Sequence, residues 1–153
     1  MLKRALFVCA VVAGLAGLGS TSARAVTVKV DAKDNSSSDG IGGAATGLFL
    51  TAGQVFTVTV ALNDLWNAGP LPRWSNANGL IAPLDATGTD DSAEPAGTPI
   101  GSIFPFWDQN NLSAPYGSLV GELGGVFFFI GTNFSGPAIA SGPLSLYYWD
   151  SNS

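Results

Sequence analysis

The chain of 153 residues has the length of one domain, and a hydrophobic content of 46% with a mean hydropathy of +0.32 excludes a disordered chain. Its formal net charge of −5 excludes the basic surface that nucleic-acid binding requires. Histidine is absent and the single cysteine is Cys9, so the usual zinc ligands and the usual general base of hydrolases are missing. Twenty Gly and nine Pro with 10% aromatic residues are typical of short strands joined by tight turns, and they predict an all-β fold.

Residues 1–25 have the pattern of a signal peptide. Two basic residues precede an uncharged apolar run at 5–19, and an Ala-Arg-Ala site for signal peptidase ends at Ala25. The alternative is a membrane anchor, but this run of about 15 residues is shorter than the roughly 20 that span a bilayer. We therefore expect a secreted or cell-envelope protein that meets a membrane only during export. Its mature chain would start at Val26 and contain no cysteine.

The first part of the mature chain predicts three strands. Residues 26–30 alternate β-branched apolar residues with polar ones, which is the period of a half-buried strand. A loop rich in Ser, Asp and Gly follows at 31–47. Two further strands are expected at 47–50 and 54–62, joined by a glycine turn.

Residues 63–115 predict a long insertion of mostly loop. Many Pro, Asn, Asp and Gly residues leave little room for regular structure there. Long loops in compact domains are often functional, so we expect binding specificity to reside in this segment.

The last part predicts three more strands, and a β-sandwich of the jelly-roll type. These strands are 117–123, 126–130 and 143–149, joined by turns at 124–125 and 131–142. The phenylalanine run at 127–129 could be read as a ligand box, but a central strand covered on both faces is the interpretation we adopt. No window shows the 3.6-residue period of a helix, which favours a sandwich. Because a polar turn follows the last strand, we expect a closing strand to be missing.

Four segments carry a resemblance to a known family. They are 66–79 (WNAGPLPRWSNANG), 116–124 (YGSLVGELG), 126–131 (VFFFIG) and 142–150 (GPLSLYYWD). The most specific elements are a Gly-Pro followed three residues later by Arg73-Trp74, the Gly-x-Leu-Val-x-x-Leu-Gly strand, and a strand ending in Asp150. In this order they resemble the bacterial galactophilic lectins, which are calcium-dependent, galactose-binding jelly rolls. The likeness runs, with gaps, from about Gly47 to the C-terminus of what looks like an exported bacterial precursor.

The resemblance implies a calcium ion that bridges the protein and two sugar hydroxyls. Ala68 would supply its main-chain carbonyl and Asp150 its carboxylate, and the family's further Asn ligands would follow Asp150 by several residues. Calcium takes about six to eight oxygen ligands, and a carbonyl ligand needs no particular side chain. On local chemistry alone, Asp150 could instead be a turn residue that bonds its own backbone.

Three tryptophans have expected roles. Trp66 and Trp74 lie in the insertion and could stack on the apolar face of a sugar ring, or they could pack in the protein interior. Trp149 lies on a predicted strand and is expected in the core.

Other carboxylates have weaker interpretations. Asp85, Asp90, Asp91 and Glu94 could form a second calcium site, but a solvated acidic loop is the more common arrangement. A glycoside hydrolase would need two carboxylates, and Asp108 with Glu122 is the one pairing to consider.

These observations predict a non-enzymatic, calcium-dependent lectin-like domain that binds a carbohydrate of the galactoside type or an exopolysaccharide. The alternative is a structural protein of the extracellular matrix or envelope without a small-molecule ligand. Calcium-dependent retention on a sugar resin would distinguish the two.

Overall fold

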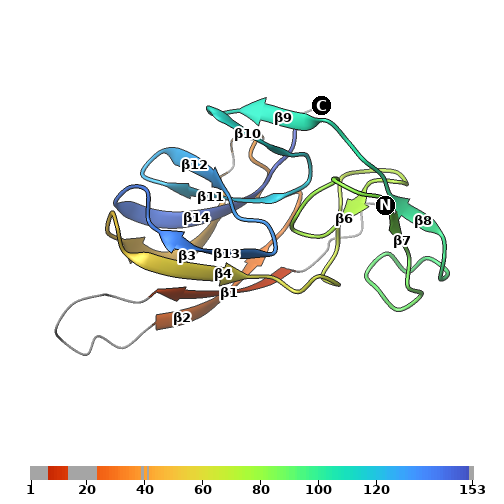
Figure 1. Ribbon diagram of the computed structural model, residues 1–153, viewed down its shortest axis with the longest axis horizontal. Coiled ribbons are helices and arrows are strands. Elements are labelled where there is room, and N and C mark those ends of the chain that lie inside the picture. Colours follow the sequence, from red (N-terminus) through yellow and green to blue (C-terminus); the bar gives the residue numbers. More distant parts are fainter. Residues whose placement is uncertain (1–6, 14–23, 39, 41, 152–153) are drawn as a thin grey trace.

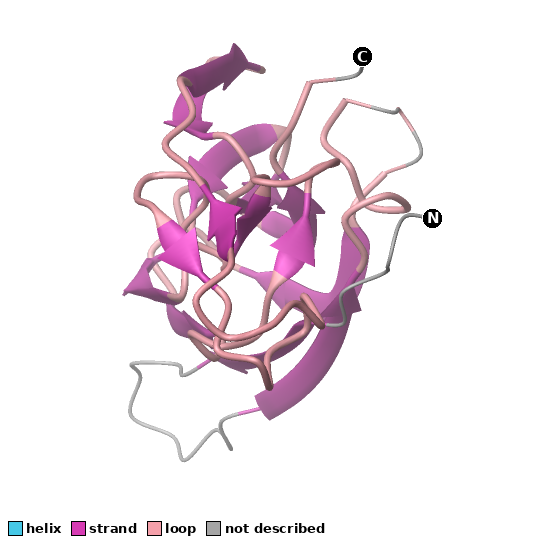
Figure 2. Cartoon of the chain, turned by 90° about the vertical axis from the view of Figure 1, so that its right-hand side faces the viewer, coloured by secondary structure: helices cyan, strands magenta, loops and turns pink. Residues whose placement is uncertain are grey.

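The structure is a computed structural model that describes residues 7–13, 24–38, 40 and 42–151 (Figure 1). These residues form strands and loops without a helix, which confirms the all-β prediction (Figure 2). Accordingly, this part of the chain has no helix that could cross a membrane. The expected signal peptide falls largely outside the described residues, apart from the strand at Phe7–Ala13 and residues 24–25.

Two four-stranded antiparallel sheets carry the fold, and we call them sheet A and sheet B (Figure 1). Sheet A has the order β13 (Asn133–Pro137), β4 (Val55–Thr59), β1 (Phe7–Ala13), β2 (Arg24–Val30). Sheet B has the order β12 (Val126–Phe129), β11 (Leu119–Leu123), β14 (Gly142–Tyr148), β3 (Ala44–Leu50). Together the two sheets are consistent with a β-sandwich; jelly-roll connectivity and a missing closing strand stay predictions.

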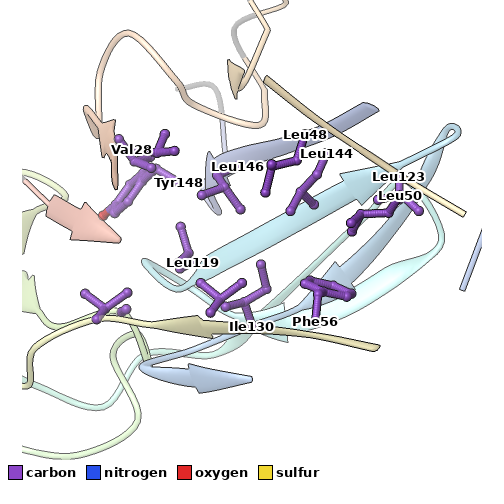
Figure 3. Packing of buried hydrophobic residues seen from close by; sticks show 14 of the residues in the cluster. Val28, Leu48, Leu50, Phe56, Leu119, Leu123, Ile130, Leu144, Leu146 and Tyr148 are labelled. Atoms are coloured by element: carbon purple, nitrogen blue, oxygen red, sulfur yellow. The ribbon is translucent and has the colours of Figure 1, made fainter. Parts of the chain in front are cut away.

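One apolar core fills the space between the sheets. Alternation along β2 turns Val28 and Val30 inward and leaves Lys29 exposed, as the sequence pattern predicts. Figure 3 shows the inward side chains of both sheets meeting, with Phe56 of β4 opposite residues of β11 and β14. The labelled members are Val28, Leu48, Leu50, Phe56, Leu119, Leu123, Ile130, Leu144, Leu146 and Tyr148. Burial of these side chains is the main source of stability in a domain without disulfides.

The 63–115 segment is more ordered than the sequence predicts. It contains the short strands β5 (Trp66–Asn67), β6 (Trp74–Ser75), β7 (Leu84–Asp85), β8 (Pro99–Gly101), β9 (Phe106–Gln109) and β10 (Leu112–Pro115). A small second core of Leu65, Trp74, Ala86 and Ile100 holds the region of β6 to β8, at the right of Figure 1.

Strands β9 and β10 form a hairpin that lies against sheet B. Asn110 and Asn111 connect them, with φ angles of 49° and 61°. Two consecutive positive φ angles give the tight turn whose twist matches a two-stranded ribbon, and Asn tolerates that conformation. Ala114 of β10 packs with the buried Val120 and Trp149, so the hairpin covers part of the outer face of the sheet.

The C-terminal part of the fold differs from the prediction at strands β12 and β13. The segment expected as a turn at 131–142 contains β13, which pairs with β4 at the edge of sheet A. The phenylalanine run forms the edge strand β12 and is not a central strand. Its two faces are nevertheless used, because Phe128 packs on Phe56 in the core and Phe127 packs on Trp149.

Candidate functional site

The segment after β14 meets the serine-rich loop that follows β2. The amide of Tyr148 donates to the carbonyl of Asn35 at 2.9 Å, and the amide of Ser37 donates to the carbonyl of Tyr148 at 2.8 Å. Asp31 shapes this loop, because its carboxylate accepts the amides of Lys33 and Asp34. The loop thereby brings three consecutive serines beside the end of β14.

Asp150 is held by these serines. The hydroxyls of Ser36 and Ser38 donate to Asp150 Oδ1 at 2.5 Å and 3.1 Å. Ser37 binds the main chain instead, because its Oγ accepts the Asp150 amide at 3.2 Å and donates to the Asp150 carbonyl at 3.3 Å. These partners are 112 to 114 residues away in sequence, so the turn interpretation of Asp150 does not describe these bonds. We call Asp150 with Ser36, Ser37 and Ser38 the Asp150–serine cluster.

The β9–β10 hairpin adjoins this cluster through side chains. Gln109 Nε2 donates to the carbonyl of Ser37 at 2.6 Å, and the indole Nε1 of Trp107 donates to Gln109 Oε1 at 3.0 Å. Trp149 Nε1 donates to the carbonyl of Trp107 at 2.9 Å, which fixes the hairpin to the end of β14. Trp107 is 37% exposed and its neighbour Phe106 is 58% exposed. The exposed Trp107 indole is therefore joined through Gln109 to the loop whose serine hydroxyls hold the Asp150 carboxylate.

Trp66 and Trp74, the predicted sugar contacts, are buried at 0% and 4% exposure. The Trp66 indole donates to the carbonyl of Gly117 at 2.8 Å, and its ring lies 4.5 Å from that of Tyr148. Neither tryptophan offers a face to a ligand, so the structure corrects this prediction in favour of packing. Trp149 is buried, as predicted.

Ala68, the predicted carbonyl ligand, lies in the turn between β5 and β6. Its amide donates to the carbonyl of Arg73 at 3.0 Å. The Arg73 guanidinium lies over the ring of Phe104 at 5.2 Å from its centroid. The Ala68 turn is thus organised around Arg73, whereas Asp150 is organised around the serine loop.

Tyr148 is a buried phenol whose pKa is affected by Asp150 and by Arg73. Burial raises the pKa of its phenol well above 10.0, the negative charge of Asp150 raises this pKa further, and the charge of Arg73 lowers it. Among the described residues, the buried hydroxyls of Tyr148 and Ser118 have no hydrogen-bond partner.

The donor set at Asp150 suits calcium in kind. The Asp150–serine cluster offers carboxylate, hydroxyl and carbonyl oxygens, which are the ligands that calcium prefers. The described part of the chain contains no group of three or more Asp, Glu, Cys or His that could hold a metal. Among the described residues, a cation here would therefore depend on the Asp150 carboxylate and on neutral oxygens.

The acidic loop has a structural role instead. Asp90 accepts hydrogen bonds from the amides and hydroxyls of Thr87 and Ser92, and Asp91 accepts the amide of Leu65 at 2.9 Å. These bonds close the loop between β7 and β8 and attach it to the start of the insertion. They favour the loop interpretation over a second calcium site.

Among the described residues, Asp108 and Glu122 share no hydrogen-bond partner. Asp108 is exposed on β9, whereas Glu122 on β11 accepts the Gly125 amide at 2.7 Å and the Tyr147 hydroxyl at 3.5 Å. Glu122 thus has a structural role at the β11–β12 turn.

No protein-family model, curated protein or solved structure matches the chain. The assignment of a function therefore depends on the site itself. Sequence reasoning selected Asp150 but missed Trp107, Gln109 and the serines. The run of three serines was a visible signal, whereas the exposure of Trp107 depends on a hairpin that the surrounding prolines obscured.

Proposed function

We propose that the protein binds carbohydrate on the surface formed by Trp107, Gln109 and the Asp150–serine cluster. The observation that carries this proposal is the continuous chain of hydrogen bonds from the exposed Trp107 indole through Gln109 to Ser37, beside the Asp150 carboxylate. Sugars present an apolar ring face and several hydroxyls, so an exposed aromatic ring next to carboxylate, amide and hydroxyl groups suits both.

Calcium is the cofactor we propose for this surface, with Asp150 as its charged ligand. When bound, the ion would supply positive charge for the sugar hydroxyls. Asp150 and the hydroxyls of Ser36 and Ser38 would hold it after the two hydroxyls rotate away from the carboxylate. The resemblance to galactophilic lectins makes galactosides the first ligands to test, in a jelly-roll domain exported through the signal peptide.

The structural-protein alternative has one observation in its favour. Both edge strands of sheet B carry exposed apolar side chains, with Phe49 on β3 and Val126 and Phe129 on β12. Exposed apolar residues on sheet edges favour pairing with other chains, as in a matrix protein.

The test measures binding of the protein to immobilised and free galactosides with calcium and with a chelator. We expect Trp107→Ala to weaken binding by about tenfold or more, the equivalent of roughly 1.4 kcal/mol. Phe49→Ala is the matched control, because Phe49 is 69% exposed but lies on β3. Asp150→Asn should abolish calcium binding together with sugar binding, whereas Asp91→Asn should preserve both. A protein that ignores calcium and every sugar of a glycan panel would favour the structural role.

A further inference from the structure

Strand β12 is an edge strand that pairs on one side only. Within the described residues its pairing partner is β11, so it lies at the opposite edge of sheet B from β3 (Figure 1). Phe127 lies on the outer face of the sheet and Phe128 on the core side. By alternation Phe129 lies on the outer face and Val126 on the core side, and these two side chains are 40% and 48% exposed. Each face of β12 therefore leaves one apolar side chain in contact with water.

The backbone of β12 also directs hydrogen-bonding groups away from the sheet. The amide of Ile130 donates to the carbonyl of Leu119 at 3.1 Å. Alternate residues of an antiparallel pair bond to the partner strand, so Phe128 faces β11 in the same way. Phe127 and Phe129 therefore direct their amide and carbonyl groups toward the free edge. A further strand beside β12 would provide partners for these groups.

The other three edges of sheets A and B carry features that oppose pairing with another strand. β13 contains Pro137, which has no amide donor. β2 carries the exposed charges of Arg24 and Lys29. β3 pairs irregularly with β14 around Gly47, and the carbonyl of Gly47 accepts a hydrogen bond from Arg24 Nη1 at 3.2 Å. Proline, charge and irregular pairing all protect an edge, and of the four edges of these two described sheets β12 alone has none of them.

We propose that β12 pairs with β12 of a second copy of this chain, antiparallel and across a two-fold axis, so that the B sheets of two copies form one continuous sheet. The axis passes beside Phe128. Phe127 then pairs with the partner's Phe129, and Phe129 pairs with the partner's Phe127. Each such pair exchanges two N–H···O bonds, which uses the edge-facing backbone groups of both copies. This assembly goes beyond the proposed function and does not rest on carbohydrate binding.

In this register the strand is complementary to itself. Residues that lie opposite each other in a ladder share one face of the sheet. Val126 therefore lies opposite the partner's Ile130 on the core side, and Phe129 lies opposite the partner's Phe127 on the outer face. Both exposed apolar side chains of β12 thus gain an apolar neighbour from the second copy.

The ends of the two strands also match. Gly125 lies opposite the partner's Gly131 in this register, and both glycines have positive φ angles, 82° and 68°, which turn the chain out of the strand. Residues 123–149 contain no charged side chain, so two copies of an acidic chain bring no like charges together along this edge. A second copy therefore fits β12 without side chains at the strand ends and without repulsion along the ladder.

The strand pair is a small interface. Stable dimers typically bury about 1,200–2,000 Å² in total, and a strand of four residues supplies less than this. We therefore expect an equilibrium between monomer and dimer rather than a permanent dimer.

The first experiment measures this equilibrium in the full chain of 153 residues, by sedimentation velocity from about 10 μM to about 1 mM protein. A reducing agent is present, because Cys9 is a free thiol that could link two copies. Phe129→Lys should raise the dimer Kd by about tenfold or more, because it places a charge on the unprotected edge. Phe49→Lys is the matched control, because Phe49 is 69% exposed on the edge strand β3 and should leave the dimer unchanged.

A backbone variant tests the hydrogen bonds of the same edge. Phe129→Pro removes an amide that faces away from β11, so each copy loses one donor to its partner and the dimer Kd should again rise by about tenfold or more. The melting temperature of dilute protein shows whether each variant folds. Phe129→Lys leaves the backbone unchanged, so it tests the proposal even if Phe129→Pro does not fold.

The second experiment locates the contact by residue-resolved amide hydrogen exchange at low and high protein concentration. The amides of Phe127 and Phe129 should exchange several-fold more slowly at high concentration, because they gain partners in the dimer. The amides of Phe128 and Ile130 face β11 in the monomer and should not change. This alternation along one strand is specific for pairing at the β12 edge.

Four results would overturn the proposal. The parent chain is a monomer at about 1 mM, or Phe129→Lys dimerises as strongly as the parent. Phe49→Lys weakens the dimer as much as Phe129→Lys does, which would assign the contact to β3. The parent dimerises, but the exchange of Phe127 and Phe129 does not depend on concentration. No sugar or calcium enters these measurements, so failure here is distinct from failure of the proposed function.

Discussion

Two carboxylates of this protein are held by hydroxyl groups, and they differ in how far apart their partners lie in the chain. Asp90 accepts the hydroxyls of Thr87 and Ser92 at 2.9 Å and 2.5 Å, from three and two residues away. Asp150 accepts the hydroxyls of Ser36 and Ser38, from 114 and 112 residues away. The bonds have similar chemistry, but one set closes a loop and the other joins the loop after β2 to the segment that follows β14.

The comparison shows why similar bonds have different consequences. A local bond needs only a few residues to be ordered, whereas a bond across more than a hundred residues forms only when the whole sandwich is assembled. Loss of Asp90 should therefore loosen one loop, and loss of Asp150 should separate two parts of the fold. Asp150 is also joined through Ser37 and Gln109 to the exposed Trp107 indole, a connection that Asp90 lacks in the contacts described above.

The largest expected effect tests this difference directly. Asp150→Ala should lower the free energy of unfolding by about 2 kcal/mol, because hydrogen bonds to a charged group contribute roughly 1.5–3 kcal/mol. Asp90→Ala should cost about 1 kcal/mol or less, because the loop can unfold locally without the core. Urea unfolding of the parent and both variants measures these values. Equal losses would show that the sequence distance between partners does not decide the cost.

The sequence predicted the parts of the fold that local pattern controls. Residues 26–30 and 54–62 alternate with period two, and the structure has strands at both places. The hidden strand β13 contains Gly136 and Pro137, which read as a turn. An edge strand tolerates proline because one side of its backbone needs no partner, and pairing with β4 then decides the structure.

The contacts of the candidate site also could not be predicted from local sequence patterns. Asp150 was selected from a resemblance, and its serine partners lie more than a hundred residues away. No local pattern in the insertion distinguishes a buried tryptophan from an exposed one. Trp66 is buried because Gly117 and Tyr148 reach it from the distant end of the chain, and Trp107 is exposed because its hairpin lies on the outside of sheet B. Only the tertiary fold supplies these contacts.

The next prediction concerns the effect of the Asp150 charge on the titration of Tyr148. Burial and the Asp150 charge raise the pKa of this phenol, so folding stability is complete below pH 10.0 and falls as the pH rises above it. The slope should approach about 1.4 kcal/mol per pH unit and disappear in Tyr148→Phe. Asp150→Asn should shift the Tyr148 titration to lower pH, and Asp90→Asn should leave it in place. Denaturation midpoints above about pH 9, and tyrosinate absorbance followed to the alkaline limit of folding with Tyr148→Phe to separate this phenol from the other tyrosines, provide the measurement. An unchanged Tyr148 titration in Asp150→Asn would contradict the prediction.

A smaller effect separates the two serines. Ser36 is buried and its hydroxyl lies 2.5 Å from Asp150 Oδ1, whereas Ser38 is half-buried and its hydroxyl lies at 3.1 Å. We expect Ser36→Ala to cost about 1 kcal/mol and Ser38→Ala about half as much, measured by urea unfolding. In an Asp150→Ala background, both serine substitutions should change the free energy of unfolding very little, which a double-mutant cycle would measure. Full additivity would mean that the serines act without Asp150.

The smallest effect is the acid titration of Asp90. Burial raises the pKa of this carboxyl, but hydrogen bonds from Ser92 and Thr87 outweigh it and leave the pKa below the ordinary 3.8. A lowered pKa in the folded state contributes stability that is present above about pH 3.8 and is lost as the pH falls through the folded-state value. Because Asp90 lies near the surface, this contribution should amount to a few tenths of a kcal/mol. Asp90→Asn should reduce the loss of unfolding free energy below about pH 4 by that amount. It should not change the loss of stability above pH 10. Nuclear magnetic resonance titration of the Asp90 carboxyl is the direct measurement, and a pKa at or above 3.8 would mean that burial outweighs the four hydrogen bonds from Thr87 and Ser92.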